Sequence, residues 1–153
     1  FSIIPWDFNE SFGTFSRGCD VRTLYIDEPT ESALSERPLI ETLLASNTNV
    51  SIYHDYLSEL INGGDLDPQA IETKIDSIES LISTAVSEDP SAFYTHSAFE
   101  AGLTELLNFA TQRAENVQDQ LNGNLDSSGD GNGCAVTNAG PGGNLPPGPP
   151  PAP

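Results

Sequence analysis

Apolar residues recur at every third or fourth position through the middle of this chain, and this periodicity limits the possible folds more than any other feature. The clearest stripe consists of Ile71, Ile75, Ile78, Ile82 and Val86. Residues with this spacing lie on one face of an α-helix. Asp67-Pro68 supplies an N-cap and a proline at the first helical position, and Asp89-Pro90 ends the pattern. The pattern therefore predicts a helix between these pairs, with Ile78 on its buried face.

Three further segments show the same period and are predicted to be helical: residues 39–44, 52–61 and 99–121. Gly63-Gly64 ends the second of these segments. The last begins with Ser97 and Glu100, which have the spacing of a capping box. We therefore predict a mainly α protein in which residues 36–121 form four helices around a common core.

Residues 1–35 are predicted to precede the helices as short strands and loops. Residues 1–6 are typical of the end of a buried strand. The β-branched and aromatic residues between Val21 and Ile26 favour a second short strand. Glycine, proline and polar residues dominate the remainder, which we assign to loops.

Residues 122–153 are rich in Gly, Asn, Ser, Asp and Pro, and they end in PPGPPPAP. Such a composition buries too little apolar surface to offset the entropy of ordering, so it predicts a disordered linker or tail. Within it, DSSGDGNG at 126–133 partly matches a calcium-binding loop. The twelfth position of that loop is Thr137 rather than a bidentate glutamate, which favours a polar linker over a calcium site.

The two cysteines, Cys19 and Cys134, lie far apart in the sequence. They form either a disulfide that closes a long loop or two unrelated thiols, and the sequence leaves both alternatives open. Two cysteines without close spacing are too few for a zinc site.

The chain is strongly acidic, with 5 Lys and Arg residues against 23 Asp and Glu residues and a formal net charge of -18. This charge repels phosphate backbones and anionic lipids, so we expect no binding to nucleic acid. No apolar run approaches the roughly 20 residues that span a bilayer. The chain begins with Phe1 and contains no methionine, so we expect it to be a piece of a longer protein.

The acid Asp7 directly follows the first predicted strand, at the point where the chain turns. A carboxylate in this position is suited to hold a divalent cation against a phosphate group. An ordinary turn cap is the alternative, because Asp side chains often accept hydrogen bonds from nearby backbone N–H groups.

Five stretches together resemble the C-terminal part of the spore coat protein H (CotH) kinase-like family. They are IPWDFNESFG, RPLIETLLA, YHDYLSELING, AIETKIDSIESLISTAVSEDP and FEAGLTELLNFATQRAENVQDQL. The resemblance covers residues 1–121 and implies the C-terminal helical lobe of an atypical protein-kinase-like fold. It also implies a parent enzyme that phosphorylates serine in coat or surface proteins with ATP and Mg²⁺. Such a parent is extracellular, on the cell surface or in the spore coat.

By this resemblance Asp7 matches the metal-binding aspartate of the family, and Asn9 either reaches the same cation or stabilises the turn. The lysine, glutamate and catalytic aspartate of the family would precede Phe1. We therefore assign no catalytic residue and no nucleotide-binding residue to this chain, and we expect it to be inactive without the remainder of its parent. The alternative function is a non-catalytic helical module for adhesion or coat assembly.

Other polar residues are less informative. His54 and His96 lack partners at ligand spacing, so we interpret both as surface or helix-end residues. Arg17 and Arg22 follow Asp7 in the sequence. They either hold phosphate or an acidic substrate, or pair with the many acids of the chain, and we favour pairing with the acids.

Overall fold

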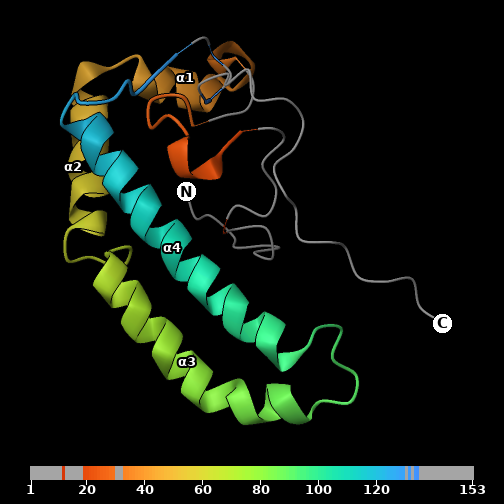
Figure 1. Ribbon diagram of the computed structural model, residues 1–153. Coiled ribbons are helices and arrows are strands. Elements are labelled where there is room, and N and C mark those ends of the chain that lie inside the picture. The colour runs from red at the N-terminus through yellow and green to blue at the C-terminus, as the bar shows by residue number, and fades with distance from the viewer. Residues whose placement is uncertain (1–11, 13–18, 30–32, 130, 132, 135–153) are drawn as a thin grey trace.

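The computed structural model describes residues 12, 19–29, 33–129, 131, 133 and 134. The described chain is helical (Figure 1). Its elements are two short 3-10 helices and four α-helices: η2 (Val21–Thr23), η3 (Leu34–Glu36), α1 (Pro38–Leu44), α2 (Asn47–Ile61), α3 (Pro68–Glu88) and α4 (His96–Leu121). The prediction of four helices within residues 36–121 is confirmed.

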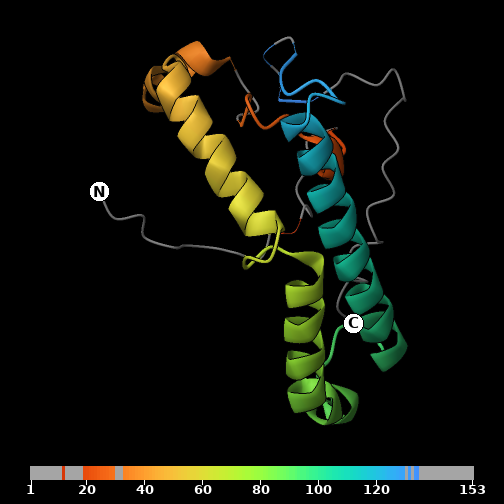
Figure 2. The same ribbon diagram turned by 90° about the vertical axis from the view of Figure 1, so that its left-hand side faces the viewer.

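The longest helix, α4, connects the other parts of the fold. It packs beside α3 as one arm of a long antiparallel hairpin, and it also contacts α2 and η2 (Figure 1). The turned view shows α2 and α3 following one another along one side of the molecule, with α4 on the other (Figure 2). None of the described helices is both long enough and apolar enough to cross a membrane.

The N-termini of α3 and α4 test the capping residues that were predicted from the sequence. Asp67 caps α3 as expected, because its side chain accepts hydrogen bonds from the N–H groups of Gln69 and Ala70. The predicted capping box of α4 is wrong, since Thr95 is the N-cap and accepts from the N–H of Ala98. Ser97 lies inside the first turn, because the helix begins one residue before it.

The hydrophobic core is smaller than the apolar stripes predicted. It consists of side chains from α2, from α4 and from the segment after η2: Ile26, Ile61, Ala114 and Val117, with Leu57 and Leu121 packed against them. Helix α3 contributes no buried residue, and Ile78 is 57% exposed. The prediction of one core shared by four helices is therefore wrong, because α3 is covered mainly on the side that faces α4.

The predicted strand at Val21–Ile26 is also wrong. Its first three residues form η2, which Asp20 caps by accepting a hydrogen bond from the N–H of Arg22. The described residues contain no strand, because the backbone groups that follow η2 bond mostly to helix side chains instead of to another strand. The strand predicted at residues 1–6 lies outside the described residues.

The described residues that follow α4 contact the segment that follows η2. The N–H of Tyr25 donates to the carbonyl of Gly133, and the N–H of Asp27 donates to that of Ser127, each at 2.9 Å. Cys134 forms a disulfide with Cys19. The disordered tail predicted from residue 122 onward is therefore not confirmed for the described residues up to Cys134, and residues 135–153 lie outside the described part of the chain.

Ile26 and Ile78 provide a matched pair of substitutions for the revised core. Ile26 is 2% exposed, so Ile26→Ala is expected to lower the free energy of unfolding by about 2–5 kcal/mol. Ile78→Ala removes the same atoms from a half-exposed position and is expected to cost less than about 1.5 kcal/mol. Urea titrations followed by far-ultraviolet circular dichroism measure both values. Equal costs at the two positions would show that the core is assigned incorrectly.

Candidate functional site

The two predicted metal ligands, Asp7 and Asn9, lie outside the described residues, as does Arg17. Phe12 is the described residue that follows them most closely in the chain. Its ring meets that of Phe109 edge to face, with the ring centroids 6.4 Å apart. The chain that follows the predicted metal-binding turn thus contacts α4. Within the described residues, no group of three or more His, Cys, Asp or Glu side chains is arranged to hold a metal ion.

The next described residues, 20–28, form what we call the docked segment, because side chains of α4 and α2 hold its backbone. Arg113 of α4 donates from Nη1 to the carbonyl oxygens of Leu24, at 2.6 Å, and Arg22, at 3.4 Å. Gln120 of α4 accepts from the N–H of Ile26 at 2.9 Å and donates to the carbonyl of Leu24 at 3.1 Å. A single buried amide therefore satisfies two backbone groups of the docked segment.

Helix α2 holds the same segment from another side. The hydroxyl of Tyr53 donates to the carbonyl of Ile26 at 2.9 Å. His54 Nε2 lies 2.7 Å from Asp27 Oδ1, and both side chains are partly buried. The sequence did not reveal this histidine–carboxylate pair, because its members are 27 positions apart and belong to different elements.

Burial shifts two ionisable groups beside the docked segment. It raises the pKa of Tyr53, and the carboxylate of Asp27 raises it further, while Arg113 opposes the shift. Burial also lowers the pKa of Arg113, and Tyr53 partly offsets this effect. Tyr53 therefore keeps its proton at neutral pH and remains a donor, and an arginine stays charged at any ordinary pH. Both groups are held in the protonation state that their contacts require.

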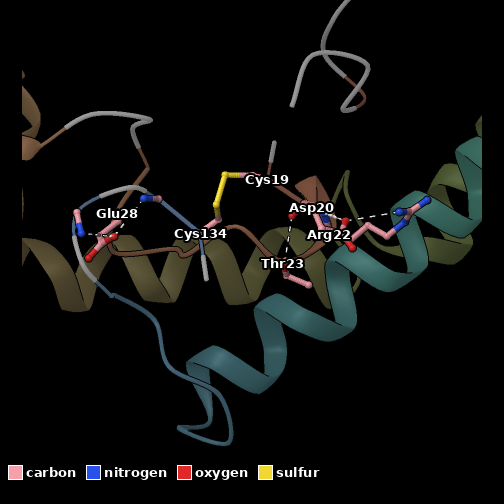
Figure 3. Close-up of a disulfide and its surroundings, with 8 residues drawn as sticks. Cys19, Asp20, Arg22, Thr23, Glu28 and Cys134 are labelled. Atoms are coloured by element: carbon pink, nitrogen blue, oxygen red, sulfur yellow. Dashed lines mark hydrogen bonds and ion pairs between the residues drawn. A yellow bond between two sulfur atoms is a disulfide. The ribbon is translucent and has the colours of Figure 1, made fainter. Parts of the chain in front are cut away.

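The last residue of the docked segment is a buried acid, Glu28. Glu28, which is labelled in Figure 3, is only 7% exposed, and it accepts hydrogen bonds from three glycine N–H groups. Gly129 donates to Oε1 at 2.6 Å, and Gly131 and Gly133 donate to Oε2 at 3.1 and 3.2 Å. We call the described residues of this stretch, 127–129, 131, 133 and 134, the strap. Its described glycine N–H groups donate to a carboxylate, Glu28.

Two features explain why the strap requires glycine. A Cβ atom on Gly129 would lie 2.6 Å from the ring of Tyr25, which is too close for the two groups to coexist without movement. Gly131 and Gly133 have φ angles of 90° and 76°, a region that other residues rarely adopt. The glycines that resembled a calcium loop therefore serve to bring backbone N–H groups to Glu28.

The remaining candidate residues take structural roles. Arg22 Nη1 lies 3.5 Å from Asp20 Oδ1, which is the acid pairing that we favoured over phosphate binding. His96 is the first residue of α4. Its Nε2 lies 3.1 Å from the hydroxyl of Ser83, and its Nδ1 lies 3.6 Å from Glu100. The prediction of a helix-end position is confirmed for His96, whereas His54 lies within α2 and faces the docked segment.

The family model described as CotH kinase protein matches residues 1–117 of the 153-residue chain. The match includes the predicted metal-binding turn, the docked segment and nearly all of α4. No curated protein and no solved structure matches the chain.

Gln120→Glu tests the anchoring of the docked segment. The substitution keeps the size of the side chain but replaces the N–H donor that meets the Leu24 carbonyl with a buried anionic oxygen. It is expected to lower the free energy of unfolding by about 1–3 kcal/mol. Gln112→Glu makes the same chemical change at an exposed position of the same helix and is expected to cost less than about 0.5 kcal/mol. Chemical denaturation of both variants measures the difference, and equal costs would contradict the anchoring role.

The raised pKa of Tyr53 predicts a dependence of stability on alkaline pH. Its phenol contributes fully below the ordinary value of 10.0, and the contribution is lost as the pH rises through the higher folded-state value. Wild type should therefore exceed Tyr53→Phe in stability by about 0.5–1.5 kcal/mol at neutral pH, with the gap closing above about pH 10. Denaturation curves across this range measure the gap. The exposed Tyr56→Phe is the control, and a gap that stays constant for Tyr53→Phe would refute the assignment.

Proposed function

The chain belongs to the CotH kinase protein family, and from this membership we propose that it is the C-terminal, metal-binding part of a kinase-like protein. The parent transfers phosphate from ATP, with Mg²⁺, to serine residues of a coat or surface protein. In this proposal residues 1–35 carry the metal-binding turn and its following loop, and residues 36–121 form the helical lobe. Residues 122–153 form a linker or tail that contains the strap.

The family match over the Pro5-Trp6-Asp7 segment is the observation that carries the proposal. Phosphoryl transfer depends on a cation that neutralises charge on the phosphates, and carboxylate oxygens are the ligands that Mg²⁺ prefers. Asp7 is the proposed anionic ligand, and Asn9 is the proposed neutral one. When bound, the metal would supply charge stabilisation to the transferring phosphate.

The described residues contribute a frame for that turn. Phe12 contacts Phe109 of α4, and the docked segment is fixed to α4 through Arg113 and Gln120. Asp7 and Asn9 precede Phe12 closely in the sequence, so the chain is anchored to α4 just after the predicted metal-binding turn. A turn anchored near one of its ends loses less conformational freedom when it binds a ligand, so such a frame favours preorganised metal binding.

The disulfide supports the proposed extracellular location. Cys19 and Cys134 are joined across 115 positions of the sequence. Disulfides of this kind form and persist in oxidising compartments and are rare in the cytosol. The high negative charge is also compatible with a surface protein that binds cations or basic partners.

The helical part alone is proposed to be catalytically inactive. A kinase also needs a lysine that contacts the phosphates and an aspartate that receives the substrate proton. Lys74 does not fit the first role, because its Nζ pairs with Asp65 at 2.7 Å and both side chains are exposed. The groups that complete the reaction are therefore assigned to the remainder of the parent.

Asp7→Asn in the parent polypeptide tests the metal-binding proposal. The amide is close in size to the carboxylate and still accepts a turn hydrogen bond, so the melting temperature should change little. Mg²⁺-dependent phosphorylation of a serine-rich protein should fall by at least about 100-fold, because a neutral oxygen is a much weaker ligand for a hard dication. Transfer of radiolabelled phosphate and Mg²⁺ titration measure the two effects.

Asp55→Asn is the matched control, since Asp55 is an exposed acid on α2. It should leave both phosphorylation and metal affinity unchanged. Wild-type phosphorylation by Asp7→Asn would leave turn capping as the role of this residue. A parent that is inactive even as wild type would favour the adhesion or coat-assembly alternative.

A further inference from the structure

We propose that the strap is a redox latch: reduction of the Cys19–Cys134 disulfide releases its described residues from the docked segment while the helices stay folded. The proposal concerns folding contacts only and does not depend on kinase activity. Figure 3 shows the two contacts that would hold the strap closed, the Cys19–Cys134 disulfide and the carboxylate of Glu28.

The strap is attached to one partner. The hydrogen bonds that join its described residues to the rest of the described chain end on the docked segment, at Tyr25, Asp27 and Glu28. The disulfide also ends next to this segment, at Cys19. All of these contacts can therefore open together without breaking a contact within the helices.

The helices and the docked segment have their own support. The core cluster contains Ile26 and side chains of α2 and α4, and it includes no strap residue. Tyr53, Arg113 and Gln120 hold the backbone of the docked segment independently of the strap. Release of the strap therefore removes only the contacts between the strap and the docked segment. The docked segment stays bonded to α2 and α4.

Without the disulfide, the hydrogen bonds alone must order the strap. Glycine loses more conformational freedom on ordering than any other residue, and the strap supplies three glycines to Glu28. The disulfide offsets this cost because it closes a loop across 115 positions. Once it is broken, water replaces the glycine N–H groups at Glu28 at little net cost, so the conformational entropy that the strap regains favours opening.

The reduction is an ordinary thiol–disulfide exchange with a dithiol as the electron donor. Cys19 is the more accessible partner, because Cys134 is only 7% exposed. A thiolate of the dithiol attacks Cys19 Sγ, the bond between the two cysteines breaks, and Cys134 leaves as a thiolate. The second thiol of the dithiol then displaces Cys19 and closes a cyclic disulfide. Two electrons pass to the cysteines, which take up the two protons that the dithiol loses.

Hydrogen exchange of the 153-residue chain with and without dithiothreitol tests the latch. In the reduced chain, exchange at the N–H groups of Gly129, Gly131 and Gly133 is expected to accelerate by at least about tenfold. Exchange within α4 between Ala110 and Val117, and the helical circular dichroism, should change little. Unchanged exchange at the three glycines would overturn the proposal, and so would loss of the helices on reduction, since the disulfide would then support the whole fold.

Glu28→Gln supplies a second, kinetic test in the oxidised chain. The glutamine amide turns an N–H₂ group toward backbone N–H donors, which weakens the strap without touching either cysteine. If the Glu28 hydrogen bonds and the disulfide hold the strap together, dithiothreitol should reduce the disulfide of this variant at least about tenfold faster than that of wild type. Glu36→Gln changes an exposed glutamate outside the latch and should leave the rate unaltered. Equal rates in Glu28→Gln and wild type would show that Glu28 does not hold the strap closed.

Discussion

One face of α4 holds the described N-terminal part of the chain in place, and the rest of the structure depends on this contact. Phe109, Arg113, Val117 and Gln120 follow one another at spacings of three or four residues, so they share one side of the helix. They meet Phe12, the carbonyls of Arg22 and Leu24, the core around Ile26, and the N–H of Ile26, respectively. The face alternates apolar packing with donors and acceptors along its length.

The polar members of this face are needed because the docked segment has no strand beside it. Each backbone N–H and C=O that leaves water must find a partner, and a sheet would normally supply it. Here the hydrogen-bond partners are side chains of the helices, Arg113 and Gln120 of α4 and Tyr53 of α2. Backbone carbonyls of the strap accept the other hydrogen bonds. An irregular segment can thus lie against the core, with Ile26 almost fully enclosed, at no cost in unpaired backbone groups at these positions.

The sequence predicted the elements of this fold better than the contacts among them. Helix periods and the Asp67 cap are local signals, and they placed all four helices. The contacts of Arg113 and Gln120 join residues about ninety positions apart, and no local pattern reports such pairings. The β-branched residues at Val21–Ile26 suggested a strand for the same reason, since propensity alone does not show that side chains of helices replace a neighbouring strand. Likewise, the glycine-rich strap had the composition of a linker, and its bonds to Tyr25, Asp27, Glu28 and Cys19 distinguish it from one.

The match over residues 1–117 confirms the family resemblance. The metal site at Asp7 and Asn9 was inferred mainly from that resemblance and stays a prediction. The frame around it has a charge pattern that composition conceals. Although acids greatly outnumber bases in this chain, Arg113 donates to two backbone carbonyls, and the acid Glu28 accepts from backbone N–H groups. A backbone dipole cannot move away or change its charge, whereas a surface carboxylate rotates freely and is screened by salt. Arg113 and Glu28 thus make their contacts to the backbone, and these contacts fix the conformation of the docked segment without depending on a mobile surface acid.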